Sequence, residues 1–367
     1  MIYTAGISIA FFLTFILLTK KNKSEADKIL VFWLFITGLD LLFNYLFLSD
    51  KYHEFPYFLG AEAPMPLFQG PLLFLYTAAL TKTSLPKNTK WLPFVIPVGW
   101  YAFAAPFLAM PVAYKIKVCQ EFGAGHENFT NSTHIAIILS GIFYVGFTIL
   151  LIKKYQIKIK EHFSDTEKIN LKWLLYLVFG IACISMAILF TNDRVIYLLI
   201  ALNVCVIGYF GVKHMGIFTN TLNSELDKPE VETFQVNKKY EKSVLTDDAA
   251  LKMHEELGRM MDTEKLFKNP ELTLSELAAT LNVNPNNLSQ VINSYENMPF
   301  YDYINSLRIA EFKRMAHLED NRKFTLLALA FEAGFNSKST FNRNFKKVTN
   351  LTPKEYLQQT NLVLRVA

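Results

Sequence analysis

The chain has 367 residues, of which 51% are apolar and 32 are phenylalanine, and its formal net charge at pH 7 is +5. A mean hydropathy of +0.21 combines a very apolar N-terminal half with a polar C-terminal third, which argues against a single soluble domain. The cysteines do not predict a disulfide framework, because Cys183 and Cys205 lie in apolar runs and Cys119 lies in a loop without a second cysteine.

Seven apolar runs follow one another in the N-terminal half. They cover residues 3–19, 29–48, 65–81, 91–110, 134–152, 171–190 and 195–212. A helix needs roughly 20 apolar residues to cross a hydrocarbon core of about 30 Å, and these runs approach or meet that length. Helices on the surface of a soluble core would carry polar stripes, which these runs mostly lack. We therefore predict a seven-span transmembrane sensor domain over residues 1–213.

The basic residues predict how this domain is oriented. With the N-terminus outside, the inner segments 20–28, 82–90 and 153–172 hold most of the lysines, and Lys213 follows the last run. The outer segments hold only Lys51, Lys115, Lys117 and Arg194. Because positive residues in short loops stay in the cytoplasm, the C-terminal region should be cytoplasmic. No basic region precedes the first run, so we do not expect a cleavable signal peptide.

One carboxylate interrupts the second run near its middle. Asp40 lies there, with Asn44 one turn further along the same face. A charge at that depth costs about 2.5–3.5 kcal/mol, which predicts a partner. A structural hydrogen bond to another span, through Gln69 or Asn203, and a role in binding a ligand or switching the bundle are equal alternatives. The candidate sensing residues are therefore Asp40, Asn44, Gln69 and Asn203.

Residues 214–261 form a polar connector that contains Pro229 and charges of both signs. From Thr246 the pattern predicts a helix, because Thr246 suits the N-cap and acidic residues follow it at the positive helix end. Apolar residues between Leu251 and Met261 recur at near-helical spacing. This helix either packs on the domain that follows, which is slightly favoured, or pairs with a second copy.

The next segment predicts a first helix-turn-helix unit. Thr273 and Glu276 form a capping box at the start of a short helix that ends at Asn282. Asn284 then caps a second helix with Pro285 at its first position. Its inward residues are Leu288, Val291 and Ile292, and its outward residues are Asn286, Asn287, Ser289, Gln290 and Asn293. A face of amides and hydroxyls is better suited to base edges than to solvent alone.

A second unit repeats this plan after one long helix over residues 300–317. That helix should span about 27 Å, close to the roughly 34 Å between successive major-groove faces. Thr325 begins the next helix, Gly334 supplies the turn and Ser337 caps a helix that buries three apolar residues. These are Phe341, Phe345 and Val348, and the outer face carries Lys338, Ser339, Asn342, Arg343, Lys346 and Lys347. Thr352, Pro353 and Glu355 begin a closing helix anchored by Tyr356 and Leu357.

This region resembles the AraC/XylS-type DNA-binding domain. A dozen positions over 27 residues carry the resemblance: Ala330, Gly334, Phe335, Ser337, Ser339, Phe341, Arg343, Phe345, Lys346, Thr352, Pro353 and Tyr356. The preceding part fits through Leu277, Ala278, Leu288, Ser289, Tyr303, Ile304, Arg308 and Ala310. The resemblance covers roughly residues 262–359. Asn297 and Asn350 stand where the family often has glycine, and asparagine also tolerates the left-handed conformation.

The resemblance implies that the second helix of each unit is a recognition helix. Its candidate DNA-binding residues are Asn286, Asn287, Ser289 and Gln290 in the first unit and Ser337, Lys338, Ser339, Asn342, Arg343 and Lys346 in the second. Arg343 is the candidate for bidentate contact with a guanine, and Lys346 for contact with a phosphate. A soluble ligand-binding domain often precedes this domain in the family. Here the apolar runs take its place, as in similar membrane-bound regulators of Bacteroidetes-like bacteria.

We therefore predict an all-α protein with a seven-helix transmembrane bundle at 1–213, a connector at 214–261 and an AraC-type DNA-binding domain at 262–367. It would be a sequence-specific transcription regulator in the bacterial inner membrane that couples a signal to gene expression. Its expected partners are double-stranded DNA, membrane lipids and an unknown small ligand or envelope signal, and a homodimer is open. No cofactor, metal or catalytic residue is predicted.

The sequence leaves two alternatives to this function. A transporter or channel with a DNA-binding regulatory tail should line its pathway with several intramembrane charges, and Asp40 is the only clearly central one. An enzyme is disfavoured, because the chain lacks a metalloprotease His pair, a phosphate-binding glycine loop and a kinase motif. His53, His126 and His134 could meet outside the membrane and hold a metal, an alternative ranked well below ordinary loop histidines.

Overall fold

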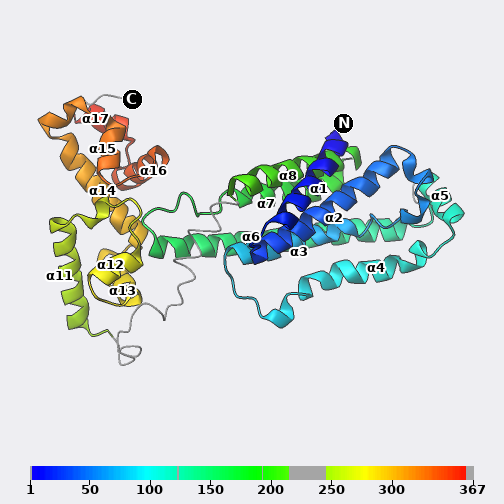
Figure 1. Ribbon diagram of the computed structural model, residues 1–367, viewed down its shortest axis with the longest axis horizontal. Helices are drawn as coiled ribbons and strands as arrows, with labels where there is room; N and C mark the ends of the chain where they lie inside the picture. Colours follow the sequence, from blue (N-terminus) through cyan, green and yellow to red (C-terminus); the bar gives the residue numbers. More distant parts are fainter. Residues whose placement is uncertain (1, 122–123, 192, 215–244, 361–367) are drawn as a thin grey trace. The chain divides into compact units, whose positions relative to one another are not determined.

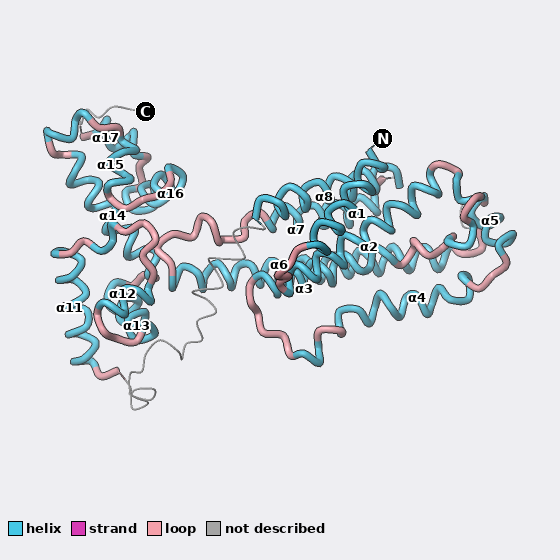
Figure 2. Tube along the Cα trace, in the orientation of Figure 1, coloured by secondary structure: helices cyan, strands magenta, loops and turns pink. Residues whose placement is uncertain are grey.

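The computed structural model describes residues 2–121, 124–191, 193–214 and 245–360, and Figure 1 shows their helices in sequence colours. Within these ranges every regular element is helical, as Figure 2 shows, and an isolated β-bridge joins Phe163 to Thr273. The chain divides into two compact units. The first comprises residues 1–154 and 171–229, and the second comprises residues 155–170 and 230–367. The predicted all-α class is therefore confirmed.

The first unit contains the apolar helices. They are α1 (Ile2–Thr19), α2 (Glu25–Leu48), α3 (Gln69–Leu80), α4 (Val95–Leu108), α5 (Val112–Gln120), α6 (Glu127–His162), α7 (Leu174–Phe190) and α8 (Asp193–His214). Each of the seven predicted apolar runs lies largely in one of these helices. The short helix α5 was not predicted, and α6 is longer than its run and continues into the second unit from Tyr155.

Only some of these helices are long enough to be candidate membrane spans. Among the described residues, α2 and α6 are long and apolar enough to cross a bilayer. The segment that contains α4 and the adjoining α5 are bent by 104° and would count as a third span only if taken together. The apolar helices at Tyr3–Thr19, Met65–Leu80, Leu174–Phe190 and Arg194–Phe210 are shorter. The structure therefore supports two or three spans by length and composition, and the seven-span arrangement stays a prediction.

Small residues allow close helix crossings in the first unit. A Cβ atom at Gly6 would lie 2.8 Å from Cβ of Ala201, and one at Gly180 would lie 2.3 Å from Nδ2 of Asn203. Glycine at such positions lets helix backbones approach each other, which is a packing mode typical of membrane helices. Ala10, Leu41, Ile200 and Val204 form a buried cluster between α1, α2 and α8.

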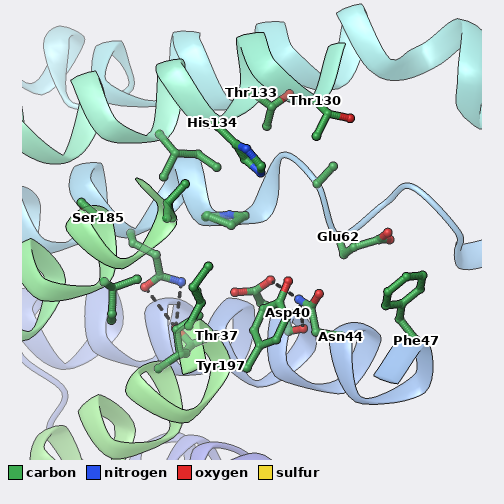
Figure 3. A pocket seen from close by; sticks show the side chains of 18 of the residues that line it. Thr37, Asp40, Asn44, Phe47, Glu62, Thr130, Thr133, His134, Ser185 and Tyr197 are labelled. Carbon is green, nitrogen blue, oxygen red and sulfur yellow. Dashed lines mark hydrogen bonds between the residues drawn. The ribbon is translucent and has the colours of Figure 1, made fainter. Parts of the chain in front are cut away.

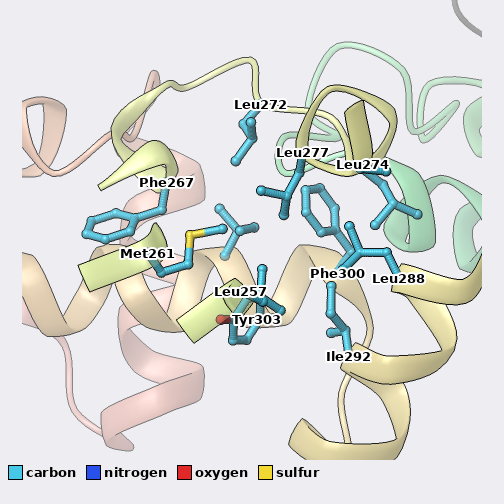
Figure 4. Close-up of a cluster of buried hydrophobic side chains, with 12 residues drawn as sticks. Leu257, Met261, Phe267, Leu272, Leu274, Leu277, Leu288, Ile292, Phe300 and Tyr303 are labelled. Atoms are coloured by element: carbon cyan, nitrogen blue, oxygen red, sulfur yellow. The ribbon is translucent and has the colours of Figure 1, made fainter. Parts of the chain in front are cut away.

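The second unit contains the helices of the polar C-terminal region. They are α11 (Asp247–Thr263), α12 (Leu274–Thr280), α13 (Pro285–Glu296), α14 (Phe300–Ala316), α15 (Leu326–Glu332), α16 (Lys338–Thr349) and α17 (Pro353–Gln359). Two hydrophobic cores hold them together. Figure 4 shows the first, to which α14 contributes Phe300 and Ile304. The second contains Ile309 and Phe312 from the same helix, so α14 is shared by both cores.

Local capping explains where most of these helices begin. Thr273 and Glu276 form the predicted capping box, and Asn284 accepts a hydrogen bond from the backbone N–H of Asn286. Thr325, Ser337 and Thr352 cap α15, α16 and α17 as predicted. The left-handed residues Asn297 (φ 52°) and Asn350 (φ 61°) end α13 and α16. These turns therefore form without glycine.

Gly334 provides the turn between α15 and α16. Its φ is +103°, and a Cβ atom at this position would lie 2.6 Å from the carbonyl oxygen of Phe267. Both the backbone conformation and the available space therefore require glycine here. The prediction for Val348 was wrong, because this side chain is 48% exposed. It lies in the last turn of α16, beyond the core that buries Phe341 and Phe345.

The helix expected around Thr246 is α11, which Thr246 caps by accepting a hydrogen bond from the N–H of Ala249. Leu257 and Met261 of α11 belong to the first core. The favoured interpretation, that this helix packs on its own domain, is therefore confirmed for these residues. Leu251 instead is 45% exposed. Most of the connector, residues 215–244, lies outside the described residues.

Candidate DNA-binding interface and a polar pocket

The second helix of each helix-turn-helix unit buries one face and presents the other. On α13, Leu288, Val291 and Ile292 are fully buried. The opposite face exposes Asn286, Gln290 and Asn293 and half-exposes Asn287 and Ser289. Capping by Asn284 and the position of Pro285 fix where this helix starts. The predicted polar face of α13 is therefore available at the surface of the unit.

The α16 helix follows the same plan with a basic face. Phe341 and Phe345 are fully buried, which turns the other side of the helix outward. The outward residues include Lys338, Ser339, Asn342, Arg343 and Lys346, with Ser337 half-buried at the cap. This set combines donors for base edges with cations for phosphates, which is what a major-groove helix requires.

Two further residues of α14, Tyr301 and Asp302, hold α16 in place. The hydroxyl of Tyr301 accepts hydrogen bonds from Arg343 Nη2 (3.2 Å) and from Asn344 Nδ2 (2.9 Å). Asp302 forms an ion pair of 2.7 Å with Lys347. These partners lie about 40 residues apart in the sequence, so no local pattern could reveal them. Tyr301 thus contacts the Arg343 side chain directly, and Asp302 pairs with Lys347 on the same helix.

Two charged residues of α14 link the loops of the second unit. Arg308 is 1% exposed and donates from Nε to the carbonyl of Phe267 (2.7 Å) and from Nη2 to that of Asn269 (2.7 Å). Burial lowers the pKa of Arg308 to about 10. Glu311 accepts from Arg314, Lys265 and Lys268, and these contacts lower its pKa to about 2, with Arg314 contributing most. Arg308, which carries part of the family resemblance, thus holds the segment that contains Phe267 and Asn269 against α14.

A carboxylate from a distant segment lies at the N-terminus of α16. Glu167 accepts hydrogen bonds from the hydroxyls of Ser337, Ser339 and Thr340, the last at 3.0 Å. Nearby, Asp165 Oδ2 accepts from Nδ2 of Asn336 at 2.6 Å. The residues 163–170 belong to the second unit. The lysines predict an inner loop for this segment, and no sequence pattern indicates these contacts.

The first unit contains a pocket that Figure 3 shows from close by. Its volume is about 610 Å³, and its lining includes all four candidate sensing residues, Asp40, Asn44, Gln69 and Asn203. The lining comes from the helices α2 to α8 and the loops between them, and is mainly apolar. The structure thus brings together polar residues that the sequence scatters over 160 positions.

The hydrogen bonds within this polar group differ from those expected. Asp40 is 0% exposed, and its Oδ1 accepts from Nδ2 of Asn44 (3.0 Å) on the same helix. Gln69 instead pairs with Trp33 Nε1 (2.6 Å) and with the hydroxyl of Thr37. Among described residues, Oδ2 of Asp40 and both amide atoms of Asn203 are buried without a hydrogen-bond partner. The predicted bond from Asp40 to Gln69 or Asn203 is therefore not the one formed.

Charged and imidazole side chains add to the pocket. Glu62, Lys115, His134 and Arg194 line it, and Lys115 donates to the carbonyl of Tyr57 at 3.1 Å. His126 lines the pocket as well, whereas His53 does not. Within the described part of the chain, no three His, Cys, Asp or Glu residues are grouped as a metal site requires. The three-histidine alternative therefore has no support in this geometry.

Comparison with known proteins is consistent with the C-terminal geometry. Residues 277–359 match the family described as "Helix-turn-helix domain". An uncharacterized HTH-type transcriptional regulator of Staphylococcus aureus (strain COL) is 29% identical over 114 residues, which are 31% of this chain and 14% of that protein. The HTH-type transcriptional regulator YtdP of Bacillus subtilis (strain 168) is 33% identical over 89 residues, or 24% and 11% of the two chains.

These matches bear on the C-terminal region only. The chain covers less than a sixth of the length of either relative, and no solved structure matches it significantly. The C-terminal region is thus a helix-turn-helix domain related to transcriptional regulators.

Proposed function

We propose that this chain is a membrane-bound transcription regulator that binds a specific DNA sequence and responds to a small ligand bound among its apolar helices. The observation that carries the proposal is the pair of helix-turn-helix units joined by α14, each with a second helix whose outward face is polar or basic. Related regulators match the same region. The residues that contact DNA and the membrane location are parts of the proposal.

The two recognition helices divide the contacts with DNA. Arg343 forms the bidentate contact with a guanine, and Lys346 binds a phosphate. On α13, amides such as Asn286 and Gln290 read base edges without adding charge. The helix α14 has 17 residues and is therefore about 26 Å long, which suits two units in adjacent major grooves.

Exposed apolar side chains support the membrane location. Phe190 is 78% exposed, Phe179 is 69% exposed and Ile142 is 64% exposed. Large apolar surfaces of this kind are rare on soluble monomers and are typical of lipid contact. The distribution of lysines supports an arrangement with the N-terminus outside and the helix-turn-helix domain in the cytoplasm. The proposed arrangement has seven spans, with the shorter apolar helices completing the bundle.

The pocket is the proposed site of signal recognition. Its volume lies within the range of roughly 300–1,000 Å³ that is typical of small-molecule sites, and it combines an apolar lining with a few polar groups. Oδ2 of Asp40 offers an acceptor and the amide of Asn203 offers both a donor and an acceptor, all without a partner among described residues. The ligand is therefore a small amphiphilic molecule that carries a hydrogen-bond donor, such as an amine or a hydroxyl.

Crosslinking of the protein to chromosomal DNA in living cells tests the DNA-binding part. We expect recovery of a shared sequence element, to which the purified full chain in nanodiscs then binds more tightly than to a scrambled version. Binding that ignores sequence would contradict the proposal. Substrate flux through vesicles that contain the protein, without specific DNA retention, would favour the transporter alternative instead.

Reporter fusions test the membrane part. A reporter that works only in the cytoplasm should be active after Lys158 or Lys213 and inactive after Lys117. Cytoplasmic activity after Lys117 would overturn the seven-span arrangement.

The substitution Asp40→Asn tests the sensing part. We expect it to fix the expression of target genes at one level regardless of stimulus, while protein abundance in the membrane stays normal. Asp50→Asn is the matched control, because Asp50 is a carboxylate outside the pocket lining. Loss of the Asp40→Asn protein from the membrane would assign Asp40 a structural role, and an unchanged response would remove it from the mechanism.

A further inference from the structure

The segment between α6 and α7 is built into the helix-turn-helix unit. Phe163 bridges to Thr273, and the backbone N–H of Ser164 donates to the carbonyl of Leu272 at 3.2 Å. Ser164 is 0% exposed. Its carbonyl accepts from Asn305 Nδ2 at 3.0 Å and from Arg308 Nη1 at 3.3 Å. Ser164 is therefore an anchor for this segment.

Three residues beyond this anchor, Glu167 lies over the start of α16. Its carboxylate accepts from the hydroxyls of Ser337, Ser339 and Thr340. Burial opposes ionisation of Glu167, but these three hydrogen bonds and the Arg343 guanidinium outweigh it and hold the pKa of the carboxyl below its ordinary value. A charged carboxylate is thus seated at the positive end of the helix.

A DNA phosphate would use the same groups. Helix N-termini bind phosphates through their backbone N–H groups and dipole, and serine and threonine hydroxyls commonly contact the DNA backbone. Ser337 and Ser339 are among the candidate DNA-binding residues of α16. Their hydroxyls cannot donate to Glu167 and to a phosphate at the same time.

We propose that residues 163–170 act as an internal plug, in which Glu167 takes the place of a DNA phosphate at α16 and keeps the domain from engaging its operator. The plug rests on the proposed role of α16 in DNA binding. DNA binding requires the part of the plug that carries Glu167 to leave the N-terminus of α16. Ser164 can remain buried in the domain meanwhile. Only molecules in which Glu167 has left α16 can bind the operator.

The position of the plug in the chain connects it to the pocket. It joins α6, which ends at His162, to α7, which begins at Leu174. The same two helices line the pocket, through residues such as His134 on α6 and Ser185 on α7. A ligand that changes the spacing of α6 and α7 would therefore pull on both ends of the plug. This route to the DNA-binding domain does not require the connector at 215–244.

Glu167→Ala tests the plug in the full chain held in nanodiscs. If Glu167 has left α16 in about one wild-type molecule in ten, removing its carboxylate raises the apparent operator affinity by about tenfold. Glu161→Ala is the matched control: it removes the same charge six residues away, and should change the affinity by less than about twofold. Equal operator affinity for wild type and Glu167→Ala would overturn the plug.

A crosslink between the plug and the domain provides an independent measurement. In a chain without its native cysteines, Asp165→Cys and Asn336→Cys should react efficiently with a short cleavable thiol crosslinker. A pair of Glu161→Cys with Asn336→Cys should react poorly. Protein crosslinked between positions 165 and 336 should bind the operator at least about tenfold more weakly than the uncrosslinked protein. Its affinity should recover when the crosslinker is cleaved. A yield no higher than that of the control pair would show that the plug does not dock.

The two proposals fail in different ways. If neither wild type nor Glu167→Ala prefers any chromosomal sequence, the proposed function is wrong, and the crosslinking yield still reports whether the segment docks. If both prefer the same operator equally, only the plug is wrong.

Discussion

The two recognition helices share a plan but differ in charge and in what covers them. The outward face of α13 carries amides and hydroxyls, whereas that of α16 carries Lys338, Arg343, Lys346 and Lys347. Tyr301 and Asp302 brace α16 from α14, and Glu167 contacts its N-terminus. In the proposed function, this difference assigns electrostatic affinity and regulation to α16, while both helices read sequence.

The largest expected effect is a loss of stability that differs in location between the two hydrophobic cores. Phe341→Ala should cost about 3–5 kcal/mol of stability and Leu288→Ala about 2–5 kcal/mol, because both side chains are fully buried. Hydrogen exchange of the full chain should show Phe341→Ala loosening α15–α17 more than α12–α13, and Leu288→Ala doing the opposite. A uniform loss of protection in both variants would mean that α14 couples the cores too strongly to be separated.

The next effect concerns base reading. Arg343→Ala should cost about 1–3 kcal/mol on the operator and relax the preference at one base pair. Gln290→Ala should relax a different base pair, about one helical turn of DNA away. Binding to a library of operators with single base changes measures both. Unchanged affinity and preference in Arg343→Ala would mean that α16 is not a recognition helix.

Salt dependence should distinguish the helices more finely. Lys346→Ala should weaken binding to all DNA similarly and lower the slope of log affinity against log salt by about 1. Gln290→Ala removes no charge and should leave that slope unchanged. Titrations at several salt concentrations give the slopes, and equal slopes for the two variants would contradict the assignment of the phosphate contact to Lys346.

The smallest effect concerns how docking of residues 163–170 at α16 depends on pH. The pKa of Glu167 is held below its ordinary value of 4.5, so its contribution to docking is complete above about pH 4.5 and is lost as pH falls through the lowered pKa. The crosslinking yield between Asp165→Cys and Asn336→Cys, divided by that of the Glu161→Cys and Asn336→Cys pair at the same pH to remove the pH dependence of thiol reactivity, should therefore be constant from about pH 6 to 8. A steep change within that window would show that another group controls docking.

Local sequence signals were sufficient for the helix-turn-helix domain. Capping residues such as Thr273 and Ser337 act on backbone groups three residues away, so their pattern is readable from a short window. The turn at Gly334 could also be predicted locally, because it needs a backbone conformation with positive φ that glycine adopts readily. Val348 was misjudged, since helical spacing gives a direction but not where the core ends.

Long-range contacts were beyond the sequence. Glu167 lies about 170 residues before the hydroxyls it contacts, and a single acidic residue in a loop carries no pattern. The polar residues of the pocket were found because they interrupt apolar runs. Their hydrogen bonds were not, as Gln69 shows by pairing with Trp33. The helix α5 was missed because Lys115 and Lys117 break its apolar character.

The sharing of α14 between two cores has a consequence for the DNA. A rigid helix embedded in both cores fixes the angle between α13 and α16 as well as their separation. The operator should therefore contain two elements in a defined helical phase. Inserting about 5 base pairs between them, half a turn of the double helix, would rotate one element to the far side, whereas inserting about 10 would restore the phase but exceed the reach of α14.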